Sequence, residues 1–200
     1  MTFSKNRTER RVRETRQLLQ QAFIELVQEK GFTAITIQEL TERADVNRGT
    51  FYIHFADKYM LIDQLIREQF HLLLTASLPS NPCWNRANLR LLIQAVLDCF
   101  EGKYRHQRYP TPILDGITTL LERAIHEELT AVLLKWLKEK PDNAGVNSDP
   151  VRLQTLQTTA RVICWSIFGT ALQWSQEPLT ISADRMTDAI LQIVLAGVPE

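Results

Sequence analysis

The sequence has no long hydrophobic run. Its longest unbroken apolar stretch, from Ile193 to Val198 with Gly197 counted, is six residues, whereas a helix that crosses a bilayer needs about 20. The first residues, Met1 to Arg7, lead into further charged residues and not into the apolar segment of a secretory signal. We therefore expect a cytoplasmic protein that does not cross a membrane.

Cysteine is scarce, and the common catalytic motifs are missing. The three cysteines form no C-x-x-C pair, so we expect reduced thiols at Cys83, Cys99 and Cys164. No G-x-S-x-G, G-x-G-x-x-G or phosphate-binding loop occurs. The segment from His126 to Thr130 begins like the zinc motif H-E-x-x-H, but Thr130 stands where the second histidine ligand belongs. We therefore expect no metal site, no cofactor and no enzymatic activity.

Charge is balanced in total but uneven along the chain. The sequence has 23 Lys and Arg residues against 23 Asp and Glu residues. Residues 1–16 nevertheless carry six basic residues and two acidic ones, a net charge of +4, and the basic ones are Lys5, Arg7, Arg10, Arg11, Arg13 and Arg16. We expect residues 1–9 to form a flexible basic arm. Such an arm either contacts a polyanion or is a solvated tail, and composition does not choose between the two.

Apolar residues recur at intervals of three and four along most of the chain, as at Leu19, Phe23 and Leu26. Strand-like alternation is not sustained anywhere, so we predict an all-α fold of about nine helices. Proline pairs and the turn-rich segment 141–150 separate these helices. The expected helices span residues 10–30, 36–44, 47–55, 57–78, 88–104, 113–116, 117–140, 151–176 and 182–197.

Two short helices and a tight turn are predicted between residues 36 and 55. Thr36 and Glu39 have the spacing of a capping box, in which each side chain satisfies a free backbone N–H of the other residue. Asp45-Val46 forms the turn, and the side chain of Asn47 caps the next helix. This arrangement is typical of a helix-turn-helix.

The second short helix presents side chains that suit the major groove of DNA. The guanidinium of Arg48 can donate two hydrogen bonds to guanine O6 and N7, and Thr50 can contact a thymine methyl or a phosphate. Phe51 and Phe55 are assigned to the small core. Donors to the DNA backbone, which set register without reading sequence, are expected at Thr36, Tyr52, His54 and Lys58. The complete set of expected DNA-contacting residues is Thr36, Asn47, Arg48, Gly49, Thr50, Tyr52, Ile53, His54 and Lys58.

Residues 10–66 resemble the DNA-binding domain of the tetracycline-repressor (TetR) family of bacterial transcription regulators. An ordered set of residues carries the resemblance: Gly31-Phe32, Thr36 to Leu40, Ala44, Val46 to Phe55, Lys58 and Leu61. The resemblance implies a dimeric helix-turn-helix protein. It also implies that a C-terminal helical domain receives a signal and that the last two helices form the dimer interface.

Three positions depart from the family pattern. Asp45 stands where the family often has glycine, at a position where a left-handed backbone is expected, which Asp tolerates at some cost. Ile53 stands where an aromatic or polar residue is common, which predicts an apolar contact with a thymine methyl. Tyr59 replaces a frequent acidic residue and changes no expected role.

The C-terminal segment holds most of the remaining large aromatic residues, which suit either a ligand pocket or a core. The candidates for an effector pocket are Tyr104, Tyr109, His126, Trp165 and Phe168. The last two expected helices carry more apolar residues than one buried face needs, which predicts a second face covered by another copy. The expected dimer-interface residues are Val162, Trp165, Gly169, Leu172, Met186, Ile190, Ile193 and Val194.

The expected organisation has four parts: a basic arm at 1–9, a helix-turn-helix domain at 10–56, a connecting helix at 57–78 and an effector-binding and dimerisation domain at 79–200. The predicted function is that of a sequence-specific DNA-binding transcriptional regulator. We expect a ligand-responsive repressor that binds an inverted-repeat operator as a homodimer. A second hypothesis keeps DNA binding but gives the C-terminal domain a protein partner in place of a small-molecule effector.

Overall fold

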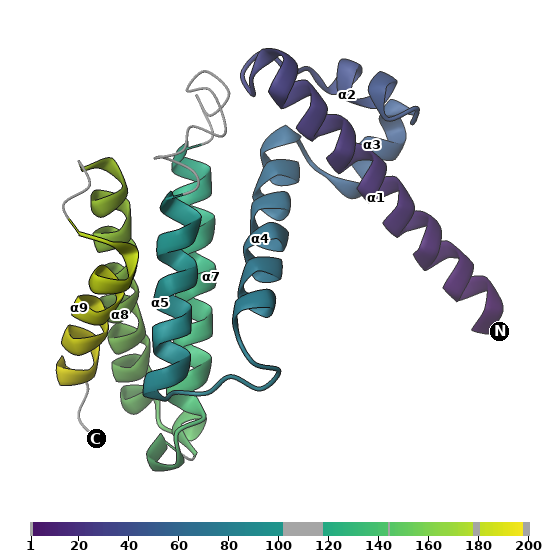
Figure 1. The fold of residues 1–200 in the computed structure, drawn as a ribbon. Helices are drawn as coiled ribbons and strands as arrows, with labels where there is room; N and C mark the ends of the chain where they lie inside the picture. The colour runs from purple at the N-terminus through teal and green to yellow at the C-terminus, as the bar shows by residue number, and fades with distance from the viewer. Residues whose placement is uncertain (1, 102–117, 144, 178–180, 198–200) are drawn as a thin grey trace. The chain divides into compact units, whose positions relative to one another are not determined.

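The computed structural model describes residues 2–101, 118–143, 145–177 and 181–197. Within these ranges the chain is all-α and contains no strand, as the periodicity predicts (Figure 1). The α-helices are α1 (Thr2–Lys30), α2 (Ile37–Arg43), α3 (Arg48–His54), α4 (Lys58–Ser77), α5 (Arg86–Phe100), α7 (Thr118–Lys138), α8 (Pro150–Gln176) and α9 (Ala183–Gly197). Two 3₁₀ turns, η2 (Pro141–Asn143) and η3 (Val146–Ser148), occupy the expected loop. The expected short helix at 113–116 lies outside the described residues.

Helix boundaries follow from local chemistry that is visible in the sequence. The side chain of Asn85 accepts a hydrogen bond from the backbone N–H of Asn88 (2.8 Å) and begins α5. Asp149 does the same for the first turn of α8, where Pro150 has no N–H that needs a partner. Gly31 ends α1 with a left-handed backbone (φ 77°) and donates its N–H to the carbonyl of Val27.

The first helix is longer than expected. The proposed arm at 1–9 and the helix beginning at Arg10 are replaced by one helix that begins at Thr2, so residues 2–9 are helical. Basic residues have good helix propensity, and neither glycine nor proline interrupts residues 2–30. The predicted start of this helix at Arg10 is therefore wrong, whereas the flexibility of residues 1–9 stays a prediction.

The described residues form two compact units, and the boundary falls inside α4 between Ile66 and Arg67. The first unit contains α1, α2, α3, the beginning of α4 and residues 118–121. Its core is built on Phe23, Phe32, Phe51 and Phe55, all buried, with ring centroids of Phe23 and Phe32 6.0 Å apart. The core phenylalanines thus fix the positions of α2 and α3 on α1.

The second unit contains the end of α4, most of α7 and all of α5, α8 and α9. α5 packs against α8 and α9, and the helices lie side by side in Figure 1. Trp136 and Trp174 are buried, and the indole N–H of Trp174 donates to the carbonyl of Ile181 (3.2 Å). The cysteines are free, and Cys164 is buried in this core. Across the described ranges, none of the helices combines the length and apolar character that a bilayer span requires.

Candidate nucleic-acid interface

The turn between α2 and α3 is a Schellman motif that depends on Asp45. The N–H of Val46 donates to the carbonyl of Thr41 (3.0 Å), and the N–H of Asp45 donates to the carbonyl of Glu42 (3.2 Å). This pairing requires a left-handed residue, and Asp45 has φ 52°, as the comparison with the family's glycine predicts. The strained aspartate therefore sets the angle at which α3 leaves α2.

Replacing Asp45 with glycine is expected to raise the free energy of unfolding by about 1 kcal/mol, because glycine adopts the left-handed conformation without a Cβ clash. Replacing Asp45 with valine is expected to lower that free energy by at least a similar amount, because a β-branched residue fits this conformation poorly. Urea denaturation of both variants checks this. A valine variant as stable as the glycine variant would show that the turn relaxes.

α3 has one buried face and one exposed face. The side chain of Asn47 accepts a hydrogen bond from the N–H of Gly49 (2.7 Å) and starts the helix. Phe51 and Phe55 are buried, as predicted, and their rings lie 5.7 Å apart. The opposite face is exposed, with Ile53 79% exposed, and its other residues include Arg48, Gly49 and Tyr52. Helical geometry thus turns the expected reading residues away from the core.

Arg48 and Tyr52 form a pair on the exposed face. They lie one helical turn apart, and Nη2 of Arg48 donates to the hydroxyl of Tyr52 (3.3 Å). The guanidinium carbon of Arg48 lies 5.8 Å from the centre of the Tyr52 ring, within cation–π range. These contacts occupy one nitrogen and leave a charged donor group at the surface, where it can meet an acceptor pair such as guanine O6 and N7.

Thr50 and His54 lie at the edges of this face and are half-buried. Burial lowers the pKa of His54, and the nearby charge of Arg16 lowers it further. Both effects favour the neutral imidazole, which has one N–H to donate. The predicted contact of His54 with the DNA backbone stays a prediction.

The structure does not place Lys58 as a free donor to DNA. Its ammonium donates to the carbonyls of Phe32 (3.1 Å), Thr33 (3.2 Å) and Ile35 (2.9 Å) and lies 4.7 Å from the centre of the Phe32 ring. An ammonium has three protons, and the three carbonyls take all of them. Partial burial and then the charge of Lys30 lower the pKa of Lys58. In this structure Lys58 ties α4 to the α1–α2 loop, and its predicted phosphate contact stays a prediction.

Thr36 also serves the fold. Its hydroxyl accepts from the N–H of Glu39 (3.3 Å), and its own N–H donates to Oε2 of Glu39 (3.0 Å), which completes the predicted capping box. The hydroxyl also donates to Oε2 of Glu39 (2.7 Å). The hydroxyl proton is thus already used within the chain. The capping role is confirmed, and the predicted phosphate contact of Thr36 stays a prediction.

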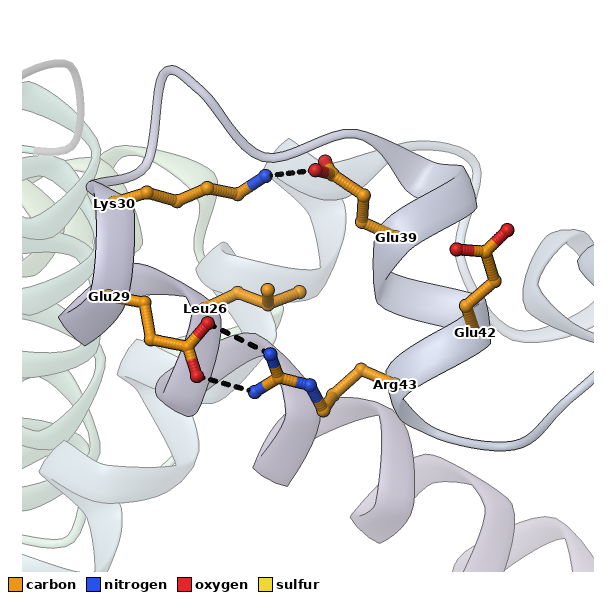
Figure 2. Close-up of a pocket in the computed structure, with 6 residues that line it drawn as sticks. All are labelled: Leu26, Glu29, Lys30, Glu39, Glu42 and Arg43. Carbon is orange, nitrogen blue, oxygen red and sulfur yellow. Dashed lines mark hydrogen bonds and ion pairs between the residues drawn. The ribbon is translucent and has the colours of Figure 1, made fainter.

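Ion pairs fasten α2 to α1 on the side shown in Figure 2. Arg43 donates to both carboxylate oxygens of Glu29 (2.7 and 2.8 Å), and Lys30 pairs with Glu39. The pairs border a shallow pocket lined by Leu26, Glu29, Lys30, Glu39, Glu42 and Arg43. Sequence reasoning missed these positioning residues, because the partners lie on different helices and their spacing along the chain carries no signal.

Acid should weaken this attachment. The hydrogen bond from Lys30, and then those from Thr36, lower the pKa of Glu39 to about 2 from an ordinary value of 4.5. A carboxylate with a lowered folded-state pKa stabilises the fold above pH 4.5, and this contribution is lost as pH falls toward 2. The Glu39→Gln variant should therefore lose less stability than the wild type between pH 5 and pH 3 in urea titrations. Equal losses would show that the pairing does not contribute.

The structure describes three of the five candidate residues for an effector pocket. Tyr104 and Tyr109 lie outside the described residues. The structure brings the other three together: the ring of His126 on α7 lies 4.5 Å from Trp165 and 5.8 Å from Phe168 on α8, as centroid distances. Nε2 of His126 is buried and has no hydrogen-bond partner in the described parts of the chain. Burial lowers the pKa of His126.

The expected dimer-interface residues divide into three groups. Val162, Trp165 and Ile193 are 60%, 59% and 67% exposed. Gly169, Leu172 and Met186 are half-buried. Ile190 and Val194 are buried inside the second unit, so the assignment of these two residues to a surface is wrong. Both residues lie on the inner face of α9. Apolar residues recur at intervals of three and four on this face as well as on the outer face, so spacing alone does not distinguish the two faces.

The first unit thus combines a capped short helix, a left-handed turn and a second short helix with a basic exposed face, which defines a helix-turn-helix protein of the DNA-binding class. Residues 19–65 match the family model described as bacterial regulatory proteins, tetR family. This match covers the first unit alone, so it is this unit that is similar to the tetR family.

Comparisons with individual proteins agree with this assignment. The chain is 40% identical over 60 residues, or 30% of its length, to the uncharacterized HTH-type transcriptional regulator YxbF of Bacillus subtilis (strain 168), and the match spans 16% of that relative's length. Three solved structures share the fold. A TetR transcriptional regulator from Streptococcus agalactiae 2603V is 19% identical, with 94% of this chain and 97% of that chain covered and a TM-score of 0.52. RolR in complex with resorcinol is 18% identical (93% of this chain and 90% of that chain covered, TM-score 0.52), and the flavonoid-responsive regulator FrrA is 18% identical (91% of this chain and 95% of that chain covered, TM-score 0.53).

Proposed function

We propose that this chain is a DNA-binding transcriptional regulator that inserts α3 into the major groove. The observation that carries the proposal is the two-sided character of α3: Phe51 and Phe55 anchor one face, while Arg48, Tyr52 and Ile53 stand exposed on the other. Arg48 donates hydrogen bonds to a guanine, and the exposed Ile53 side chain contacts a thymine methyl. Such a helix presents both hydrogen-bonding and apolar discrimination.

The proposed regulator acts as a homodimer. Val162 and Trp165 on α8 and Ile193 on α9 are large apolar side chains that remain well exposed in the single chain. Covering them with the same surface of a second copy removes this apolar area from water and satisfies two-fold symmetry. Two copies carry two α3 helices, so the operator is an inverted repeat. The proposed role is repression, which requires that the operator overlaps a promoter.

The proposed signal is a small molecule recognised by the second unit. The clustered rings of His126, Trp165 and Phe168 offer stacking surfaces, and the unpartnered Nε2 of His126 offers a hydrogen bond. Two proteins with this fold have aromatic small molecules in their names, resorcinol for RolR and flavonoids for FrrA. In a second candidate the signal comes from a protein partner, and the exposed indole of Trp165 then contacts this partner and not a second copy of the chain.

Selection of bound sequences from a random double-stranded DNA pool tests the proposal, at one fixed salt concentration because non-specific affinity varies with salt. The expected result is an enriched inverted repeat. Sedimentation equilibrium should give twice the 23.1 kDa mass of one chain. A pool without any enriched sequence would reject sequence-specific binding, and an enriched site without two-fold symmetry would reject the dimer.

A further inference from the structure

α1 extends well beyond the core that it helps to build. Its first buried residue is Leu19, and the side chains from Arg10 to Glu14 are exposed. At about 1.5 Å per residue, the segment from Thr2 to Leu19 reaches roughly 25 Å. In Figure 1 this part of α1 projects away from α2 and α3. Packing within the first unit does not explain why the chain keeps these turns helical.

The projecting segment is strongly basic. Residues 1–16 have a net charge of +4. Arg10 is partly neutralised by Glu14 (2.7 Å), but both side chains are well exposed, so this pair contributes little. The side chains of Arg11 and Arg13 are exposed and form no ion pair with the described residues from Arg10 onward. Their charges are available to a polyanion.

Contacts of Arg16 place the start of this segment beside the end of α3. Nη2 of Arg16 donates to Oε1 of Gln64 (2.5 Å), and its guanidinium carbon lies 5.7 Å from the centre of the Phe55 ring. The charge of Arg16 is also close enough to lower the pKa of His54. The basic turns of α1 therefore begin next to the last turn of α3 and are continuous with the proposed DNA-reading surface.

We propose that residues 10–18 form a second DNA-contacting element, a rigid basic helix that binds phosphates flanking the site read by α3. This inference rests on the proposed function. A helix with its side chains is about 10–12 Å wide, whereas the minor groove is about 6 Å wide, so this helix cannot enter it as a flexible arm would. It lies along the phosphates instead, and its contribution is independent of sequence.

The salt dependence of binding tests this proposal. The logarithm of the affinity constant should be measured against the logarithm of salt concentration for the wild type, Arg11→Gln, Arg13→Gln and the double variant. Each phosphate contact that is lost should reduce the slope by about 0.9, and each substitution is present in both copies of the homodimer, so the double variant should lose about 3.6. The loss should be the same on the selected operator and on a scrambled duplex. Glutamine keeps good helix propensity, which preserves the backbone.

The control is Arg86→Gln, an exposed arginine at the start of α5 in the second unit, which should leave the slope unchanged. Trimming the duplex to the enriched site should weaken the wild type and leave the double variant nearly unaffected. An unchanged slope in the double variant, with operator preference intact, would overturn the proposal and leave α3 as the reader. A wild type that does not prefer the operator over the scrambled duplex would instead overturn the proposed function itself.

Discussion

Replacing Arg48 with alanine is expected to lower discrimination between the operator and a duplex that lacks the contacted guanine by about 1–3 kcal/mol per contacted base pair, or about five- to 150-fold. Alanine keeps the helix, and the buried anchors Phe51 and Phe55 are untouched. Fluorescence anisotropy with both duplexes at one salt concentration measures the effect. Affinity for the scrambled duplex should change far less, because a base contact is absent there.

Tyr52→Phe is the matched control for this experiment. It keeps the aromatic ring beside the guanidinium but removes the hydroxyl that accepts from Arg48 at 3.3 Å. We expect a smaller loss of discrimination than for Arg48→Ala, because the guanidinium remains but is less well oriented. If Arg48→Ala weakened binding to all sequences by one common factor, Arg48 would be a phosphate contact and its assignment to base reading would be wrong.

The second large effect is expected at Lys58. Replacing it with methionine should lower the free energy of unfolding by about 2–4 kcal/mol. Hydrogen bonds to charged groups contribute about 1.5–3 kcal/mol each, but the site is only half-buried, so water replaces part of what the three carbonyls lose. The carbonyls belong to Phe32, Thr33 and Ile35. Methionine keeps an apolar side chain against the Phe32 ring, so the loss of unfolding free energy measures the contribution of the ammonium group. Urea denaturation measures the change.

Lys135→Met provides the matched control, because the Lys135 side chain is exposed and pairs with Glu139 only at 4.0 Å. This variant should be within about 0.5 kcal/mol of the wild type. If Lys58→Met were equally stable but bound all DNA sequences less tightly, the carbonyl contacts would not matter and Lys58 would be the phosphate contact that its position in the sequence first suggested.

Much of the first unit could be predicted because its signals are local. The capping box at Thr36 and the cap at Asn47 act within three residues, so the sequence displays both partners. The left-handed backbone at Asp45 was predicted from the glycine that the family often has there. The exposure of Tyr52 and Ile53 follows from helical periodicity once Phe51 is assigned to the core.

Hydrogen bonds and ion pairs between residues that are far apart in the sequence could not be predicted. Lys58 lies more than twenty residues from the carbonyls that it contacts, so nothing near it in the sequence shows that its protons are used. The ion pair of Arg43 with Glu29 joins two helices across fourteen positions, and the local sequence of either residue does not indicate it. Residue type indicated what these side chains can bind, whereas only the fold shows what they do bind.

The second unit shows a different limit of periodicity. Ile190 and Ile193 are both apolar and three residues apart on α9, yet the first is buried and the second is 67% exposed. Spacing identifies apolar stripes, but it does not tell which stripe belongs to the protomer's own core. The separation of the two required the positions of α5 and α8, which supply the surfaces that α9 covers.

The central claim is that Arg48 reads a base within the site bound by α3. A double-mutant cycle tests it most directly: the wild type and Arg48→Ala are each titrated with the selected operator and with an operator in which the guanine pairs of both half-sites are replaced. Our account predicts a coupling energy of about 1–3 kcal/mol for each half-site between Arg48 and the guanine. Additive losses at every operator position, with no coupling to Arg48, would contradict it.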